Sequence, residues 1–305
     1  MPRTFIARLL LLLALLALGV AARAKPIEVV VSIKPLALIA ERVAGEEAEV
    51  RTLLPPGVSP HEFALRVSDM RLIRGADLAV WVGPELEGFL QKPFAGLSGA
   101  QLITAVNLAA IQWPADAAAE REHQSDAGHS ASHAHGRDSH VWLNPANAAV
   151  LAQELAQRLG QLVPAQAAVF TARAEQFVAE LKALDAALEQ KLSAVRNLGF
   201  AVYHDGYHHF VAHYQLNQVD YVALTPERRP GARHLYELEK HLKREAVCLF
   251  VEPYADTDAA TAMAQRVGLR TGVLDPLASD TAIADYPGLM NRLATALVGC
   301  LQGAY

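Results

Sequence analysis

The sequence predicts an α/β protein of two similar lobes, each a parallel-type sheet flanked by helices, joined by one long connecting helix. Short apolar runs alternate with amphipathic segments in both halves of the chain, which is typical of βαβ units. A long helical segment without glycine or proline separates the two halves. The chain has 305 residues, which is enough for two domains of ordinary size.

The first 24 residues have the composition of a secretory signal peptide. Arg3 and Arg8 form a basic start, residues 9–20 form an apolar stretch, and residues 22–24 form a small-x-small cleavage site. We therefore expect an exported protein whose mature chain begins near Lys25. The apolar stretch is too short for a membrane anchor, and no cysteine near the cleavage site offers a place for a lipid.

Residues 25–163 form the expected N-terminal lobe. Four apolar runs in it have the length of buried strands, at residues 27–33, 49–54, 76–82 and 101–106. Helices are expected over residues 36–43 with a stop at Gly45, over 68–74 with Ser68 as the cap, and over 85–90. A last helix, capped by Asn144 with Pro145 at its first position, runs to about residue 162.

Pro164 opens the long helix, which we expect over residues 164–195. Its apolar residues recur at helical spacing, and a helix extends about 1.5 Å per residue, so it reaches past one lobe. A position near the middle of the mature chain favours a rigid connector over an outer helix of one domain. Residues 196–305 form the C-terminal lobe, with strands expected over 199–204, 219–224, 246–251 and 269–275, and helices over 206–214, 232–243, 257–267 and 286–301.

The chain contains two cysteines. Cys248 lies in a buried-strand pattern, and Cys300 lies near the end of the last expected helix. In an oxidising compartment such an isolated pair favours a disulfide that fastens the helix to its sheet. Two buried free thiols are the alternative.

A polar, histidine-rich stretch covers about residues 115–139 and contains His123, His129, His133 and His135. Its composition predicts a mobile loop, because the segment cannot bury enough surface to offset its ordering entropy. We expect weak, secondary metal binding there, and a merely solvated or tag-like run is the alternative. His140 ends the stretch and is followed at once by the apolar run Val-Trp-Leu, so we expect it to be held rigidly.

Three further polar residues lie at the ends of predicted strands or on the loop that follows one. His61 lies on a proline-stiffened loop, His204 ends the first strand of the C-terminal half, and Asp275 ends the last. In open α/β sheets ligands bind beyond the carboxyl ends of strands, so these residues and His140 predict a metal site in the cleft between the lobes. Three neutral imidazoles and one carboxylate suit tetrahedral Zn²⁺. Glu62, adjacent to His61, is an alternative ligand.

Five segments carry a family resemblance: GVSPHEFALRVSDMRLIRGADLAVWVGPELEGFL, HVWLNP, YHDGYHHFVAHYQL, FVEP and LDPLAS. In this order, and over essentially the whole mature chain, they resemble the zinc-binding proteins of bacterial ABC uptake systems, the ZnuA-like group. The resemblance implies a periplasmic solute-binding protein that passes zinc to a membrane permease with its ATPase. It also implies zinc ligands at His61, His140 and His204, and it fits a pairing of Cys248 with Cys300.

The resemblance leaves the fourth ligand open. Some members use an acidic residue just before the first histidine, where this chain has Pro60, and related proteins use an aspartate at the position of Asp275. Water and Glu62 are the alternatives. Manganese-binding members tend to have a carboxylate at the position of His204, so the imidazole there favours zinc. A binder of manganese or another divalent metal is the alternative function.

Other classes of function have less support. A secreted zinc hydrolase would need a positioned general base, and the sequence contains neither HExxH nor a nucleophile elbow, so we expect no enzyme activity. A metal-buffering or adhesion protein would not need two lobes and a permease partner. The net charge of -5 and the lack of a basic stripe argue against nucleic acid as a partner, and we expect a monomer.

Overall fold

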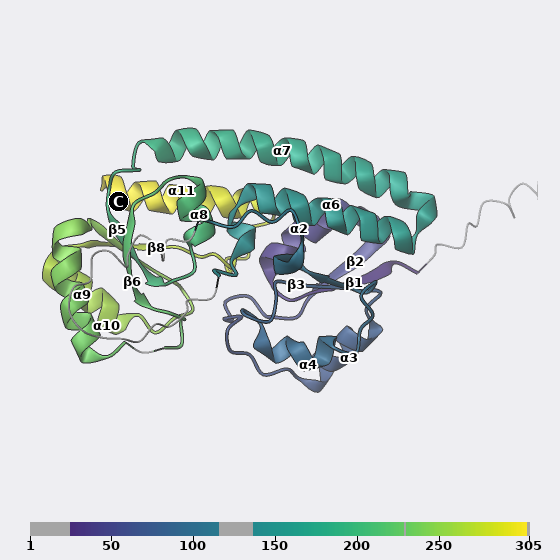
Figure 1. Ribbon diagram of the computed structural model, residues 1–305, viewed down its shortest axis with the longest axis horizontal. Coiled ribbons are helices and arrows are strands. Elements are labelled where there is room, and N and C mark those ends of the chain that lie inside the picture. The colour runs from purple at the N-terminus through teal and green to yellow at the C-terminus, as the bar shows by residue number, and fades with distance from the viewer. Residues whose placement is uncertain (1–24, 116–136, 229, 304–305) are drawn as a thin grey trace, which may run out of the picture.

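The computed structural model describes residues 25–115, 137–228 and 230–303. Two four-stranded parallel sheets lie side by side beneath a long helix, α7 (Ala167–Ser193), which runs over both of them (Figure 1). The predicted architecture of two similar α/β lobes joined by a long helix is confirmed. Within the described residues, no helix combines the length and the apolar character that crossing a bilayer requires.

The N-terminal sheet has the strand order β2-β1-β3-β4, with every pair parallel. Its strands are β1 (Ile27–Val31), β2 (Ala48–Thr52), β3 (Leu78–Trp81) and β4 (Leu102–Thr104). The helices of this half are α2 (Lys34–Ala44), α3 (Val67–Gly75), α4 (Gln91–Phe94) and α6 (Pro145–Leu162). Gly45 ends α2 with φ of 61°, a conformation that glycine adopts without steric cost.

The C-terminal sheet repeats this order as β6-β5-β7-β8, again with every pair parallel. Its strands are β5 (Phe200–His204), β6 (Gln218–Ala223), β7 (Cys248–Val251) and β8 (Arg270–Val273). The helices are α8 (His208–His213), α9 (Ala232–Glu245), α10 (Asp258–Val267) and α11 (Tyr286–Gln302). Since all strands of a sheet are parallel, the carboxyl ends of four strands meet at one edge in each lobe.

Two helix predictions in the N-terminal half are wrong. Ser68 does not cap α3, because the helix begins before it and the backbone N–H of Arg66 donates to Asp69 Oδ2 at 2.7 Å. The acidic residue in the first turn, rather than the serine, sets this helix start. The helix expected over residues 85–90 is a turn followed by a short 3₁₀ segment (Gly88–Leu90). By contrast, Asn144 caps α6 as expected, and its Oδ1 accepts from the Ala146 backbone N–H at 2.8 Å.

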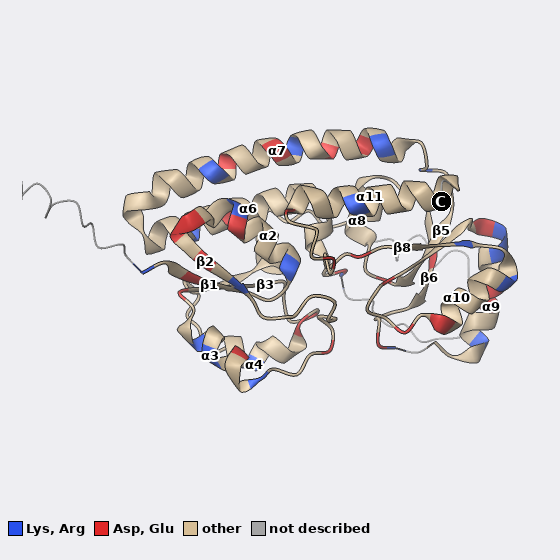
Figure 2. Ribbon diagram, turned by 180° about the vertical axis from the view of Figure 1, so that it is seen from behind, with Lys and Arg blue, Asp and Glu red and all other residues tan. Residues whose placement is uncertain are grey.

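The long helix α7 contains 27 residues and therefore spans about 40 Å. It packs against α2 and α6 of the N-terminal half and against α11 of the C-terminal half, which lies along it. Acidic and basic residues are distributed along its length (Figure 2). Its buried face is apolar and consists of Phe170, Ala174, Phe177, Leu181, Leu184, Leu188 and Leu192. One continuous apolar core therefore extends from the first sheet through these helices to the second.

Two buried hydrogen bonds join the lobes near the carboxyl ends of their strands. Trp142 Nε1 donates to the carbonyl oxygen of Pro276 at 2.9 Å, and the Tyr286 hydroxyl donates to the carbonyl oxygen of Trp142 at 2.6 Å. Trp142 and Tyr286 are at most 1% exposed, so both bonds are shielded from water. A hydrogen bond made where water cannot compete holds its geometry closely.

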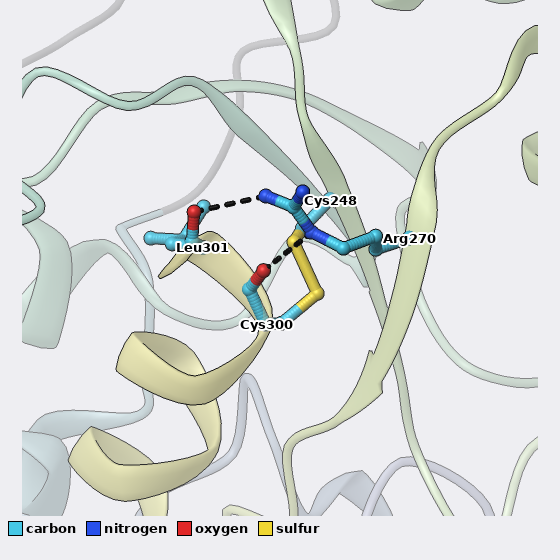
Figure 3. Close-up of a disulfide and its surroundings, with 4 residues drawn as sticks. All are labelled: Cys248, Arg270, Cys300 and Leu301. Carbon is cyan, nitrogen blue, oxygen red and sulfur yellow. Dashed lines mark hydrogen bonds between the residues drawn. A yellow bond between two sulfur atoms is a disulfide. The ribbon is translucent and has the colours of Figure 1, made fainter. Parts of the chain in front are cut away.

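The predicted disulfide is confirmed: Cys248 on β7 pairs with Cys300 on α11, with Cα atoms 6.3 Å apart. Arg270 on β8 strengthens the same junction. Its guanidinium donates to the carbonyl oxygens of Cys300 and Leu301, at 2.7 and 2.9 Å (Figure 3). These carbonyls lie at the carboxyl end of α11, where a cation also interacts favourably with the helix dipole.

Replacing both Cys248 and Cys300 by serine is expected to lower the free energy of unfolding by about 2–4 kcal/mol, because the open chain gains loop entropy. Denaturant unfolding of the oxidised wild type and the double variant measures this. Metal stoichiometry should stay the same, and a reducing agent should destabilise the wild type but not the variant. Equal stability of the two proteins, or free thiols in protein isolated from the periplasm, would contradict the pairing.

Candidate metal site

Three histidines from separate parts of the chain converge between the lobes. His61 lies on the loop after β2, His140 directly precedes a 3₁₀ turn (Val141–Leu143), and His204 is the last residue of β5. One ring nitrogen from each lies within 4.8 Å of the other two. His140 and His204 are 4% and 1% exposed, and His61 is partly buried. The structure therefore brings together the three histidines that the sequence singled out.

The spacing of two ring nitrogens fits a tetrahedral metal ion. His140 Nε2 lies 3.2 Å from His204 Nε2. Two nitrogens that are each about 2.0–2.1 Å from one zinc ion, at a tetrahedral angle, lie roughly 3.3 Å apart. At this distance two lone pairs repel each other unless a proton or a cation lies between them. The pair is therefore suited to share a cation.

Glu252 holds His204 in the orientation that ligation needs. Its Oε1 accepts a short hydrogen bond from His204 Nδ1 and a second bond, of 2.8 Å, from the Tyr207 hydroxyl. Because Nδ1 carries the donated proton, Nε2 of the neutral ring keeps its lone pair for a metal. Burial lowers the pKa of His204, but the charge and hydrogen bond of Glu252, together with the charges of Asp138 and Asp205, outweigh it, so the pKa is raised overall.

Asp138 holds His140 in the orientation that ligation needs, as Glu252 does for His204. Its Oδ1 accepts from His140 Nδ1 at 2.6 Å and from the backbone N–H of His140 at 3.0 Å. Its Oδ2 accepts from the backbone N–H of His208, at the start of α8, at 2.9 Å. Burial acts to raise the pKa of Asp138, but the charge of and hydrogen bonds from His140 outweigh it, so the carboxyl pKa is well below its usual range.

His61 contributes a nitrogen that no protein group satisfies. Its Nε2 is buried and has no hydrogen-bond partner, while its backbone N–H donates to Ser59 Oγ at 3.3 Å. Burial and the neighbouring His140 and His204 lower the pKa of His61 to about 2, so the ring is neutral at any physiological pH. A buried polar atom without a partner costs free energy, which a bound cation would recover.

Gly206 lies in close contact with two of the three histidine rings. A Cβ atom at this position would come within 2.1 Å of His204 Nε2 and within 2.7 Å of His140 Cε1. Any side chain here would therefore displace both rings. Sequence reading missed Gly206, Asp138 and Glu252, although Glu252 directly follows a buried strand and Gly206 lies in the turn after His204.

Comparison with known proteins identifies the family of this chain. The protein family described as "Zinc-uptake complex component A periplasmic" matches residues 29–300. The chain belongs to this family. A high-affinity zinc uptake system protein ZnuA of Yersinia pestis is 33% identical over 290 residues, which cover 90% of this chain and 91% of the relative.

Two solved structures share the fold. A crystal structure of ZnuA has a TM-score of 0.75 at 23% identity, covering 90% of this chain and 99% of its own. The laminin-binding protein Lmb of Streptococcus agalactiae has a TM-score of 0.76 at 23% identity, covering 91% and 100%. Both comparisons support the two-lobe architecture.

Asp275 and Glu62 lie outside the group of three histidines. The carboxylate of Asp275 accepts from the backbone N–H groups of Leu277 and Ser279, at 3.2 and 2.6 Å, and from Ser279 Oγ at 3.1 Å. It thus stabilises the turn that follows β8. The side chain of Glu62 is exposed. A role of either carboxylate as fourth ligand stays a prediction.

Other histidines of the C-terminal half have separate partners. His213 Nε2 lies 2.7 Å from Asp185 Oδ1 on α7, and His241 Nδ1 lies 2.8 Å from Asp220 Oδ2. His234 Nε2 lies 3.1 Å from the carbonyl oxygen of Val222. The four loop residues His123, His129, His133 and His135 lie outside the described residues, so weak metal binding by them stays a prediction.

Replacing Glu252 by glutamine is expected to weaken metal binding by about 10–100-fold, because the charge that fixes the His204 tautomer is lost. Titration of the purified protein against a competing chelator measures this. Glu237, an exposed glutamate of the same lobe, offers the matched control Glu237→Gln, which should bind as the wild type does. An unchanged affinity in Glu252→Gln would show that the carboxylate does not act on the ligand.

Proposed function

We propose that this protein captures Zn²⁺ in the periplasm and delivers it to the membrane permease of an ABC transporter, with its ATPase. The observation that carries the proposal is the convergence of His61, His140 and His204, with ligand nitrogens within 4.8 Å of one another. The relative from Yersinia pestis is named a high-affinity zinc uptake system protein, which supports both the cargo and the route. The signal-peptide pattern of the first 24 residues supports export.

The chemistry of the donors supports zinc over manganese. All three grouped ligands are imidazoles, which suit borderline metals, whereas Mn²⁺ prefers carboxylate and water oxygens. In each of the two buried carboxylates beside them, Asp138 and Glu252, one oxygen accepts from the Nδ1 atom of His140 or His204. They therefore support the imidazoles instead of replacing them as ligands. Asp275, Glu62 or a water molecule would complete the tetrahedron.

The fold alone does not distinguish an adhesive function from a transport function. The structure of Lmb from Streptococcus agalactiae is described as that of a bifunctional protein with adhesin and metal transporting activity. Two lobes therefore do not argue against adhesion, contrary to the expectation from sequence. Transport is favoured because the buried histidine group is suited to one small cation, and because the family is named for zinc uptake.

Replacing His61, His140 or His204 singly by alanine should weaken zinc binding by more than about 100-fold. This loss is larger than the one expected for replacing a carboxylate that only orients a ligand, such as Glu252. Chelator competition with Zn²⁺ tests this. His213→Ala, which removes a histidine bound to α7, is the matched control and should bind normally. Asp275→Ala should have a smaller effect than any of the three, because water can take its place. Normal affinity in all three alanine variants would refute the proposed site.

Zinc binding should weaken as the pH falls, because zinc needs the deprotonated Nε2 of His204. Despite burial, Glu252 raises the pKa of His204 above the ordinary histidine value of about 6.5, so the loss should begin at a higher pH than for a free histidine. His61, with a pKa of about 2, adds nothing to this loss. Affinity measured between about pH 8 and about pH 5 tests the prediction. The Glu252→Gln variant should show its loss at lower pH, and a flat profile would refute the assignment.

Deleting residues 116–136 should remove weak, additional zinc binding and keep one tight site. Fixing a residue on binding costs about 1–2 kcal/mol, and the polar composition of this stretch predicts that its histidines would have to be fixed in this way. A flexible Gly/Ser linker would join residues 115 and 137 in the variant. Calorimetric zinc titration of this variant measures both kinds of binding, and a longer deletion of residues 116–138 is the comparison.

Only the longer deletion removes Asp138, so only it should weaken the tight site. Loss of tight binding in both variants would show that residues 116–136 donate a ligand to the tight site.

A further inference from the structure

We propose that His209 and Asn147 form a clasp that positions the zinc ligand His140 by fixing Asp138. The inference rests on the proposed zinc-binding function and names two positioning residues for that site. Neither side chain belongs to the group of three histidines at the metal site. Each of the two is 1% exposed, and they come from different halves of the molecule, since Asn147 lies on α6 and His209 on α8.

The hydrogen bonds of His209 determine which nitrogen carries its proton. Its Nε2 lies 3.0 Å from the carbonyl oxygen of Asp138, and a carbonyl oxygen only accepts, so Nε2–H is the donor. In the neutral ring Nδ1 is then an acceptor, and Asn147 Nδ2 lies 3.3 Å from it. Burial lowers the pKa of His209, which agrees with a neutral ring. Both nitrogens of this buried histidine are therefore in use.

Asn147 is equally constrained. Its Oδ1 accepts from the backbone N–H of Gln112 at 2.7 Å, and its Nδ2 donates to the carbonyl oxygen of Gln112 at 3.1 Å and to His209 Nδ1. The side-chain amide thus makes two hydrogen bonds to the backbone of Gln112, one to its N–H and one to its carbonyl oxygen, as the backbone of a neighbouring β-strand would. Because its oxygen and both amide hydrogens have partners, only one orientation of the amide satisfies the network.

The clasp connects the residues that precede residues 116–136 with those that follow them. Gln112 and Trp113 precede residues 116–136, and Arg137 and Asp138 follow them. The Trp113 ring packs on the ring of His209, with centroids 5.5 Å apart, and the Arg137 guanidinium lies over Trp113 at 5.0 Å. Both sides are therefore fixed to the same histidine.

Asp138 is the link from the clasp to the metal site. His209 binds its backbone carbonyl, while its carboxylate binds the Nδ1 and the backbone N–H of His140. A carboxylate directs an imidazole only if its own backbone is fixed. Without the clasp, the backbone carbonyl of Asp138 would lose its hydrogen bond, the carboxylate would be held only through the His208 N–H and His140 itself, and His140 Nε2 would be oriented less firmly toward His204. The clasp thus separates a rigid ligand from the histidine-rich stretch that precedes it.

Two substitutions of His209 separate hydrogen bonding from packing. His209→Phe keeps an aromatic ring of similar volume but removes both polar contacts, and it should weaken zinc binding by about 10-fold or more. His209→Gln keeps a donor and an acceptor and should bind more tightly than His209→Phe. Chelator competition gives the affinities, and the visible spectrum of the Co²⁺-loaded protein reports ligand geometry. His213→Ala, one turn further along α8, is the control.

Asn147→Ala perturbs the clasp from the other helix and should change the affinity and the Co²⁺ spectrum in the same direction. The thermal unfolding midpoint of each metal-free variant shows whether it is folded. If His209→Phe and Asn147→Ala are folded and both have the affinity and spectrum of the wild type, the proposal is overturned. Equal losses in His209→Phe and His209→Gln would likewise overturn it, because packing alone would then explain them.

A double-mutant cycle tests whether His209 acts through Asp138. In an Asp138→Ala background, His209→Phe should cost no further affinity, since there is no carboxylate left to position. Additive losses would refute this route. Failure of the proposed function has a different signature, because the wild type and the His213→Ala control would then bind no zinc tightly, whatever residue occupies position 209.

Discussion

An imidazole serves as a metal ligand when the correct nitrogen is deprotonated and points at the ion, and a buried carboxylate on the other nitrogen enforces both conditions. His140 with Asp138 and His204 with Glu252 are two such pairs, one in each half of the site. Because they are shielded from water, each hydrogen bond fixes its ring more firmly than it would at the surface. The two sheets, the turn after His140 and the start of α8 all serve to bring these pairs face to face.

The fold was readable from the sequence because its elements are regular and strongly periodic. Alternation predicted both sheets, and the rule that ligands lie beyond the carboxyl ends of parallel strands identified His61 and His204. The same rule applies to Glu252, which follows β7. Its importance depends on β7 lying next to β5 in the sheet, and strand order is a tertiary property that residue patterns do not encode.

Local geometry explains the other misses. Helical spacing from His204 directs attention to His208, but His204 ends a strand and α8 begins four residues later, so that spacing has no meaning there. His208 reaches Asp138 only through its backbone N–H, and the imidazole that contacts Asp138 is that of His209. Asp138 lies at the end of a stretch whose composition predicts only disorder, and nothing in that composition indicates the hydrogen bonds that Asp138 makes to His140. Gly206 was missed because closeness to two rings is visible only in three dimensions.

The buried bonds of Trp142 to Pro276 and of Tyr286 to Trp142 have a consequence for the unloading of the cargo. None of their atoms belongs to a candidate ligand, so they resist separation of the lobes whether or not an ion is bound. Separating the halves requires breaking both bonds in addition to any metal contacts, so they slow the escape of an ion held at the three histidines. Under the proposed function, docking on the permease would supply the free energy that breaks them.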